Sequence, residues 1–345
     1  MGMYNPDAFI NRLYADGDAT QALAFHKIGA GDWKSWRSEL KEQFKVSLGG
    51  LNDMSDTPQP RILSRTEYAD YSLEQIEITT AESLCMPMYL LLPRGRQGKV
   101  PVVIGCHGHG YGYNAALGLL PDGQEIGDAF SDHRKFAISL VKRGFAVLVP
   151  ELLGFGQRKL KDEVIVNSHT NSCFSIGVFL LTLGKTMAGM RIQETMKAID
   201  YVSTREEIDP QRIGIMGLSG GGLVASFTSA LDERIQATVV CCYTNTFRAS
   251  ILSSRHCIDN YIPGILRYAE MPDLIGLIAP RPLFIEAGSN DPLFPAYATE
   301  QAIDVLHDVY AAADVPDNLD YHIFPGVHEV WGERAYPWLE RQLLG

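Results

Sequence analysis

Short apolar segments alternate along most of the chain with longer segments whose apolar positions recur every three or four residues. A short, nearly continuous apolar run is typical of a strand buried on both faces, whereas the wider spacing is typical of an amphipathic helix. The strands predicted in this way are residues 72–79, 84–92, 100–106, 145–150, 212–216, 234–242, 281–287 and 319–324. The predicted helices are residues 128–143, 190–203, 220–230, 295–312 and 333–344.

This alternation predicts an α/β fold with a mostly parallel twisted sheet flanked by helices. The first two strands are joined by a polar turn, which favours an antiparallel pair. In such sheets ligands bind beyond the carboxyl ends of the strands. Residues 152–185 and 244–273 interrupt the alternation, and each segment follows a predicted core strand. Insertions at that edge usually shape a pocket or lid, so we expect cap-like insertions there.

Residues 1–70 have a different pattern, which predicts an N-terminal helical extension before a catalytic domain at residues 71–345. Asp32 is a predicted N-cap, and the pair Gly49-Gly50 ends the helix that follows it. Helical spacing in that segment relates Trp33, Trp36, Leu40 and Phe44. The apolar stripe predicts a cover on the core or on a partner subunit of a homo-oligomer, with a separate binding module as the alternative. Residues 56–60 are predicted to be a linker.

The charge and composition exclude several kinds of partner. Hydrophobic residues make up 46% of the chain and charged residues 21%, as in an ordinary globular protein. The formal net charge of -11 opposes long-range attraction to nucleic acid or to an anionic membrane. The longest apolar run, residues 176–183, is too short to span a bilayer. We therefore expect neither nucleic acid nor a membrane as a partner.

The cysteines and the N-terminus favour a reducing compartment. The six cysteines form no C-x-x-C pair, and most lie in apolar runs, which predicts buried free thiols. The N-terminal residues show no basic segment followed by an apolar one, so no secretory signal is predicted. We expect a cytoplasmic protein.

The segment Gly-Leu-Ser-Gly-Gly at residues 217–221 lies between a predicted strand and a predicted helix. G-x-S-x-G in that context is typical of a nucleophile elbow, in which a sharp turn exposes the serine hydroxyl. A phosphate-binding loop has similar glycine spacing but requires Lys and Ser/Thr where this chain has Leu223 and Val224. Ser219 is therefore the predicted nucleophile.

A serine hydroxyl becomes a good nucleophile only when a base takes its proton and an acid holds that base. In this type of fold the order along the chain is Ser, then Asp or Glu, then His. His328 follows the last predicted strand on a loop containing Gly and Pro, so it is the predicted base. His307 lies in a helix and His322 in a strand, which favours surface or packing roles. His256 belongs to an insertion.

Asp291 is the predicted acid because it follows the strand at residues 281–287, one strand before the predicted base. A carboxylate at that strand end can orient an imidazole and stabilise its charged form. Asp304 lies on a helix face and Asp320 precedes a strand, so both are predicted to be solvated. Asp259 remains the alternative acid.

Two backbone N–H groups are expected to bind the oxyanion that forms during acyl transfer. One is that of Gly220, the residue after the nucleophile, and the other belongs to the glycine-rich loop at residues 107–112. His107 and His109 in this loop have the spacing of a metal pair. No carboxylate or third histidine lies beside them in sequence, so no metal is predicted. No cofactor is predicted either.

Four residues at strand ends or in insertions are candidates for substrate contact: Tyr111, Glu151, Tyr243 and His256. The alternative for each of them is ordinary loop packing.

Several motifs together resemble those of the α/β-hydrolase superfamily, and most closely the dienelactone hydrolase and acetyl xylan esterase (cephalosporin-C deacetylase)-like esterases. The resemblance covers about residues 73–345. The motifs are His-Gly-His-Gly at 107–110, Pro-Glu-Leu-Leu-Gly-Phe-Gly at 150–156, Gly-Leu-Ser-Gly-Gly at 217–221, Ala-Pro-Arg-Pro-Leu at 279–283, Asn-Asp-Pro-Leu-Phe-Pro at 290–295 and Gly-Val-His at 326–328.

The resemblance implies a triad of Ser219, Asp291 and His328, with the backbone N–H groups of His109 and Gly220 as the oxyanion hole. Two departures from the family pattern stand out. Dienelactone hydrolase carries a cysteine nucleophile, so a serine favours ordinary ester hydrolysis. Acetyl xylan esterases usually have Gln at the position of Gly220. The predicted function is a serine carboxylesterase acting on small-molecule esters. The alternatives are amide or peptide hydrolysis, carbon–carbon bond hydrolysis, or a non-catalytic binding protein of the same fold.

Overall fold

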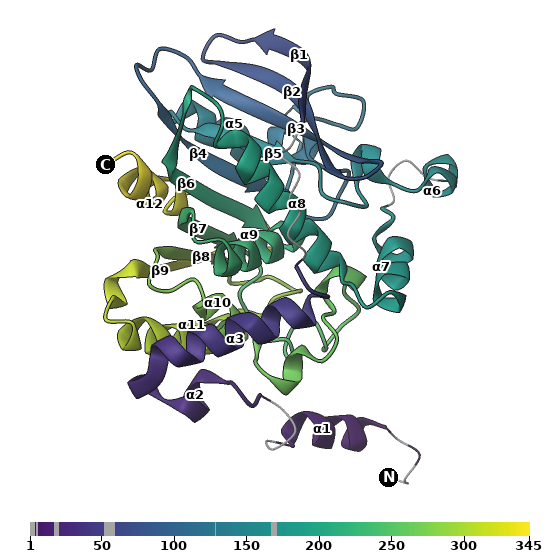
Figure 1. The fold of residues 1–345 in the computed structure, drawn as a ribbon, viewed down its shortest axis with the longest axis vertical. Coiled ribbons are helices and arrows are strands. Elements are labelled where there is room, and N and C mark those ends of the chain that lie inside the picture. The colour runs from purple at the N-terminus through teal and green to yellow at the C-terminus, as the bar shows by residue number, and fades with distance from the viewer. Residues whose placement is uncertain (1–3, 5, 17–20, 52–58, 128, 167–170) are drawn as a thin grey trace.

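The computed structural model describes the chain except residues 1–3, 5, 17–20, 52–58, 128 and 167–170. Within the described residues one sheet has the strand order β1-β2-β3-β5-β4-β6-β7-β8-β9 (Figure 1). The strands are β1 Pro60–Glu67, β2 Tyr71–Ala81, β3 Leu84–Pro93, β4 Val100–Cys106, β5 Ala146–Pro150, β6 Ile208–Leu218, β7 Ile235–Cys241, β8 Leu283–Gly288 and β9 Leu319–Phe324. Pairings among β1, β2, β3 and β5 are antiparallel, and those from β5 across to β9 are parallel. The predicted mostly parallel sheet and the antiparallel pair β2–β3 are confirmed.

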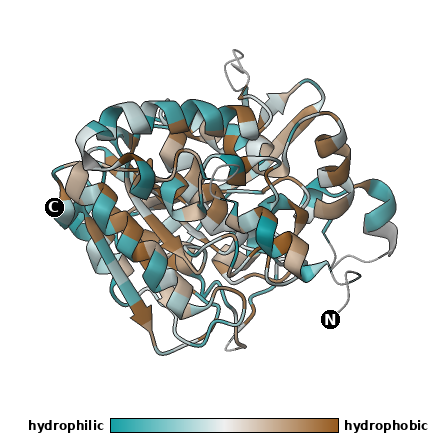
Figure 2. Ribbon diagram, turned by 90° about the horizontal axis from the view of Figure 1, so that it is seen from below, coloured by the Kyte–Doolittle hydropathy of each residue, from teal (hydrophilic) through white to brown (hydrophobic). Residues whose placement is uncertain are grey.

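Helices cover both faces of the sheet. Those described are α1 Asp7–Ala15, α2 Phe25–Ile28, α3 Trp33–Ser47, α4 Asn114–Leu117, α5 Phe136–Lys142, α6 Lys161–Val166, α7 Cys173–Thr182, α8 Met187–Val202, α9 Gly220–Leu231, α10 Met271–Gly276, α11 Ala296–Ala312 and α12 Ala335–Leu343. One face packs against α8, α9 and α11, and the other against α5 and α12. Hydrophobic stretches concentrate on the central strands and on the helix surfaces turned toward them (Figure 2). Two buried apolar layers therefore hold the parallel strands, whose carboxyl ends meet at one edge.

The predicted helix after residue 32 is α3, which lies outside α9 and α10 (Figure 1). Trp36, Leu40 and Phe44 are buried, and the Phe44 ring packs edge-on against Phe227 of α9 with 4.9 Å between ring centroids. The predicted cover on the core is thus confirmed. Asp32 precedes the helix, but its side chain makes no capping hydrogen bond.

Two parts of the chain differ from the sequence prediction. Strand β1 was not predicted, because all of its residues are exposed and it has no buried face to produce an apolar pattern. It pairs with β2 by backbone hydrogen bonds, so the segment predicted as helical contributes an edge strand. The predicted helix at residues 128–143 is shorter, and α5 begins only at Phe136, because Arg134 and Lys135 adopt positive φ angles. Most of the predicted linker lies outside the described residues.

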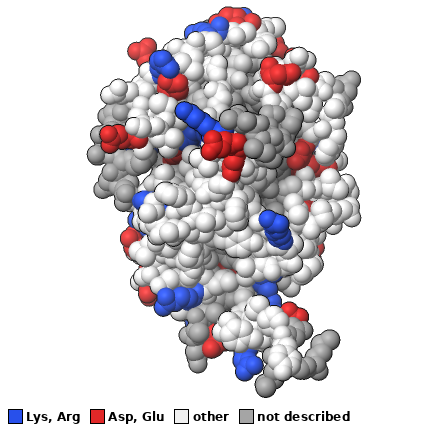
Figure 3. Space-filling view, turned by 90° about the vertical axis from the view of Figure 1, so that its right-hand side faces the viewer, with Lys and Arg blue, Asp and Glu red and all other residues white. Residues whose placement is uncertain are grey.

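The surface shows mixed charge. On the face drawn in Figure 3, basic and acidic side chains are scattered among uncharged ones. Among the described residues no single helix has the length and apolar character to cross a membrane. Helices α7 and α8 together have the length and apolar composition of a membrane span, but the chain bends by 101° between them.

Candidate active site

Ser219 occupies the sharp turn between β6 and α9, as predicted. Its backbone adopts φ 57° and ψ -120°, a conformation that residues other than glycine rarely take. A Cβ atom on Gly217 would collide with the backbone of Gly221, and a Cβ atom on Gly221 would collide with the carbonyl groups of Cys106 and His107. Glycines at these positions therefore let the strand and the helix approach closely, and the turn between them presents the serine.

His328 and Asp291 form a hydrogen-bonded pair, with 2.7 Å between Nδ1 of the imidazole and Oδ2 of the carboxylate. The other carboxylate oxygen accepts hydrogen bonds from the backbone N–H groups of Leu293 (2.8 Å) and Phe294 (3.1 Å). The Phe294 ring stacks on the imidazole with 5.7 Å between centroids. Asp291 is thus fixed by backbone donors, and it orients an imidazole whose Nε2 remains available.

The loop that carries His328 is bound to the sheet by Glu286 on β8. This buried carboxylate accepts hydrogen bonds from the backbone N–H groups of Trp331 (2.9 Å) and Gly332 (2.8 Å). Burial raises the pKa of Glu286. The backbone N–H of Val330 also donates to the carbonyl of Asp132, at 2.7 Å. These bonds tie the final loop to the sheet and so hold the imidazole in place.

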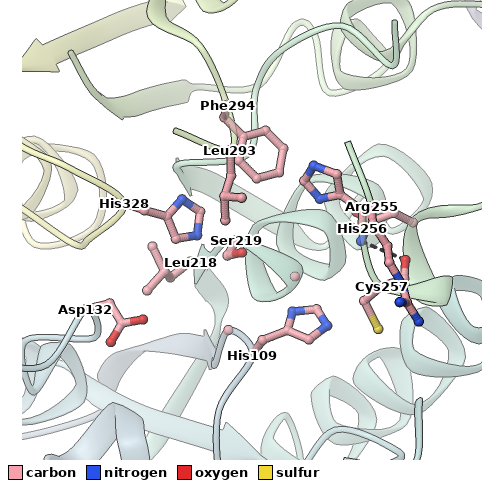
Figure 4. Close-up of a pocket in the computed structure, with 13 residues that line it drawn as sticks. His109, Asp132, Leu218, Ser219, Arg255, His256, Cys257, Leu293, Phe294 and His328 are labelled. Carbon is pink, nitrogen blue, oxygen red and sulfur yellow. Dashed lines mark hydrogen bonds between the residues drawn. The ribbon is translucent and has the colours of Figure 1, made fainter. Parts of the chain in front are cut away.

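Ser219 and His328 line one cavity of about 260 Å³ at the carboxyl edge of the sheet. Its wall also includes Gly220, His109, Phe294 and His256. In Figure 4 the rings of His328 and His109 lie on different sides of the serine. The structure thus brings Ser219 and His328, the predicted oxyanion residues and one predicted substrate contact to a single cavity, and Asp291 is hydrogen-bonded to His328.

The glycine-rich loop after β4 lies against the nucleophile. A Cβ atom on Gly108 would stand 3.5 Å from the Cβ atom of Ser219. The backbone N–H of Gly108 donates to Nε2 of His133 at 2.8 Å. Burial lowers the pKa of His133 to about 3, with a further contribution from His107, and an unprotonated nitrogen suits this acceptor role. Among the described residues no acceptor pairs with the backbone N–H of His109.

The N–H of Gly220 belongs to the first turn of α9, where helical N–H groups lack intrahelical partners. Gly220 and His109 both line the cavity with Ser219. Two backbone donors and the positive end of a helix dipole can stabilise negative charge there.

A second histidine–carboxylate pair lies beside the first. Nε2 of His109 is 3.2 Å from Oδ2 of Asp259, which is the acid that the sequence left as an alternative to Asp291. Asp259 is fully buried and also pairs with the guanidinium of Arg191. Burial would raise the pKa of Asp259, but His109 and Arg191 outweigh this effect and hold the pKa below its usual value. Asp259 therefore belongs to His109, and His328 is paired with Asp291.

Four possible metal donors also meet at this second pair. One atom each of His109, Cys173, Cys257 and Asp259 lies within 4.8 Å of the others. The sequence argument against a metal looked only for neighbours in sequence, and the structure supplies these donors from distant segments. However, Arg191 donates to Asp259 and, at 3.0 Å, to the sulfur of Cys173. The guanidinium thus already provides positive charge where a cation would bind.

Three of the predicted substrate contacts are not among the residues that line this cavity. Glu151 is fully buried and accepts a hydrogen bond from the backbone N–H of Tyr113 at 3.0 Å, so it orders the loop after β4. Tyr243 is buried between Phe227 and Phe294, in the packing role given as its alternative. Tyr111 is partly exposed outside the cavity wall. The fourth candidate, His256, does line the cavity, and its Nε2 atom is buried without a partner among the described residues.

Sequence reasoning did not find Arg191 or His133, which support the site. Both lie on segments that predict ordinary helix packing, and neither falls within a recognisable motif. An arginine in an otherwise apolar helical pattern is a weak signal, because a buried guanidinium requires a buried acceptor that only the fold identifies.

Comparison with known proteins places this geometry in a family. Residues 17–331 match the model of the Abhydrolase family. A protein of Bacillus subtilis (strain 168) named "Putative hydrolase YtaP" is 31% identical over 292 residues, covering 81% of this chain and 90% of that protein.

Solved structures share the fold. A crystal structure described as "a putative acetyl xylan esterase" from Bacteroides fragilis NCTC 9343 superposes with a TM-score of 0.79 at 18% identity, covering 99% of this chain and 95% of the other. A glucuronoyl esterase from Solibacter usitatus gives a TM-score of 0.70 at 14% identity, covering 94% and 97%. Given the match to the family over most of its length, the chain belongs to the Abhydrolase family and is a hydrolase of the α/β-hydrolase fold.

Proposed function

We propose that the protein is a serine carboxylesterase that hydrolyses small carboxylic esters through an acyl-enzyme intermediate. The observation that carries this proposal is the 2.7 Å hydrogen bond between Asp291 and His328, because His328 lines one cavity with a serine held on a strained turn. A base oriented by an acid beside an exposed hydroxyl is the arrangement that acyl transfer requires.

In the proposed reaction, Nε2 of His328 takes the proton of Ser219 as its oxygen attacks the ester carbonyl. Asp291 stabilises the imidazolium that forms, since its carboxylate already binds Nδ1. The tetrahedral oxyanion is held by the backbone N–H groups of His109 and Gly220. The imidazolium then protonates the leaving alcohol, and water activated by the same imidazole hydrolyses the acyl-enzyme.

The dimensions of the cavity favour a short acyl group. Its volume of about 260 Å³ is slightly smaller than that of most ligand pockets, and Leu218, Leu293 and Phe294 supply apolar wall. The esterases among the structural neighbours are consistent with an ester substrate. We therefore propose acetyl and similar short esters as the substrate class.

The test is Ser219→Ala, assayed on p-nitrophenyl acetate, butyrate and octanoate and by labelling with a fluorophosphonate. We expect kcat to fall by roughly 10⁴-fold or more, labelling to disappear, and the wild-type enzyme to prefer the acetate. Ser254→Ala is the matched control, because Ser254 is exposed and does not line the cavity. Hydrolysis retained in Ser219→Ala at the level of the control would contradict the proposal.

A further inference from the structure

The side chain of His109 faces the place where the oxyanion is expected to form. Its ring lines the cavity with Ser219 and lies near the serine on a different side from His328 (Figure 4). A Cβ atom on Gly220 would stand 2.8 Å from both Cε1 and Nδ1 of this ring. The Nδ1–Cε1 edge of the imidazole therefore covers Gly220, the residue whose N–H is a proposed oxyanion donor.

The opposite edge of the ring is fixed by buried groups. Nε2 of His109 faces Oδ2 of Asp259 at 3.2 Å, and the Phe155 ring packs edge-on against the imidazole with 5.3 Å between centroids. Oδ1 of Asp259 accepts a hydrogen bond from the side chain of Asn260 at 2.8 Å. Nε2 is thus buried beside the Asp259 carboxylate, in a charge contact without hydrogen-bond geometry, while the Nδ1–Cε1 edge lies over Gly220 at the cavity.

The charges around this ring favour its protonated form. The titratable and charged groups that face it are Asp259, Arg191, Cys173, Cys257, His133 and His256. A hydrogen bond from Cys257 and the charge of Arg191 lower the pKa of the Cys173 thiol. Burial lowers the pKa of His109, but Asp259 and Cys173 more than compensate and raise it to about 9.

We propose that the protonated side chain of His109 donates a hydrogen bond from Nδ1 to the oxyanion, as a third donor beside the two backbone N–H groups. This inference rests on the proposed esterase function and assigns a catalytic role to a side chain in addition to its backbone. It also accounts for Gly220. A longer side chain there, such as the Gln usual in acetyl xylan esterases, would displace the imidazole from its position over the helix N-terminus.

The experiment compares the wild-type enzyme with His109→Phe and His109→Gln on p-nitrophenyl acetate from pH 6 to pH 10. Both variants keep the backbone N–H of residue 109, and Phe also keeps a ring packed over Gly220. A donor that acts only in the transition state lowers kcat and leaves KM nearly unchanged. We expect His109→Phe to lower kcat by about 100-fold, and His109→Gln, whose amide can still donate, by about 10-fold.

The pH profile separates catalysis from structure. The wild-type kcat is expected to fall as the pH rises through about 9, where the imidazolium loses its proton. Neither variant should show this fall, because neither Phe nor Gln titrates. A kcat for His109→Phe within threefold of the wild type, a loss confined to KM, or an alkaline fall that persists in both variants would overturn the inference.

The failure of this inference is distinguishable from the failure of the proposed function. If Ser219→Ala is inactive but His109→Phe is fully active, only the proposed role of the His109 side chain is rejected. If Ser219→Ala is active, the proposed esterase mechanism itself is rejected. Circular dichroism of each variant establishes that it is folded. His307→Phe, at an exposed position on α11, is the matched control for the substitution.

Discussion

Two histidine–carboxylate pairs flank the same serine, and they differ in which ring nitrogen is held and in what holds the acid. Asp291 binds Nδ1 of His328 and is itself held by backbone N–H groups. Asp259 faces Nε2 of His109 and is held by the guanidinium of Arg191. The first pair thus leaves Nε2 free toward the serine, and the second leaves Nδ1.

The comparison shows how a histidine–carboxylate pair can be arranged either to accept a proton or to donate a hydrogen bond. Both imidazoles meet a buried carboxylate, but only the ring of His109 also lies beside the Cys173 thiol, whose pKa is lowered. Because the pKa of His109 is raised to about 9, its protonated form is favoured near neutral pH, and that form can donate a hydrogen bond. The carboxylate of Asp291, by contrast, is held by the neutral backbone N–H groups of Leu293 and Phe294.

The largest expected effect comes from breaking the pair that is proposed to act as acid and base. Asp291→Asn keeps the size of the side chain, but its amide can donate to Nδ1 and so favours the tautomer in which Nε2 carries the proton. We expect kcat on p-nitrophenyl acetate to fall by roughly 10⁴-fold, or about 5 kcal/mol. His307→Ala, on an exposed helix face, should leave kcat unchanged. If Asp291→Asn cost no more than His109→Phe, the two pairs would not have the separate roles assigned to them.

The next effect is on stability and concerns only the second pair. Arg191 is 1% exposed, donates to Asp259 and to the carbonyl of Leu153, and lies over the Phe155 ring. Arg191→Met removes one of the two cations that face the buried carboxylate of Asp259 and leaves only His109, so we expect the free energy of unfolding to fall by about 3 kcal/mol. Urea denaturation measures this change.

Two variants test whether that loss of stability comes from the broken charge pair between Arg191 and Asp259. Arg255→Met removes an arginine that lines the cavity but is exposed, and should change stability by less than about 0.5 kcal/mol. In Arg191→Met/Asp259→Asn the buried charge is removed as well, so part of the stability should return. A cost below about 1 kcal/mol for Arg191→Met would mean that backbone groups hold Asp259 as they hold Asp291.

Much of the fold could be predicted because strands buried on both faces produce a recognisable apolar pattern in the sequence. The central strands are apolar on both faces, so their residues form continuous runs, and the glycines around Ser219 mark the elbow. Strand β1 has no buried residue, so its sequence shows no apolar pattern that would predict a strand. The start of α5 could not be predicted either, since Arg134 and Lys135 take left-handed backbone conformations next to His133, which binds the loop after β4.

Site residues that directly follow a strand could be predicted from the sequence. Residues that come together only through tertiary packing could not. Asp291 and His328 follow β8 and β9, so chain order and topology alone place them at one edge. The cluster around His109 joins segments near residues 109, 173, 191 and 259, and no pattern in any one of them indicates the others. Glu151 and Tyr243 also end strands, yet their side chains turn into the core, because a position at a strand end does not fix the direction of a side chain.

The smallest expected effect is a pH dependence of the free energy of unfolding, which should arise from the His109–Asp259 pair and not from the His328–Asp291 pair. The pKa of His109 is raised from 6.5 to about 9 in the folded protein. Its protonation therefore contributes stability that is fully present below about pH 6.5 and is lost as the pH rises through about 9. The full shift would correspond to about 3 kcal/mol, and solvent screening at the partly exposed ring reduces this to roughly 1–2 kcal/mol.

Urea denaturation at pH 6.5 and pH 9.5 measures this contribution when the wild type is compared with His109→Gln. The wild type should lose roughly 1–2 kcal/mol more than the variant over this interval, since the variant has no proton to release there. His328→Gln is the matched control, and it should lose as much as the wild type because it retains the charged cluster. Equal losses in the wild type and His109→Gln would show that His109 is neutral in the folded protein, and the contrast between the two imidazoles would then reduce to their orientation alone.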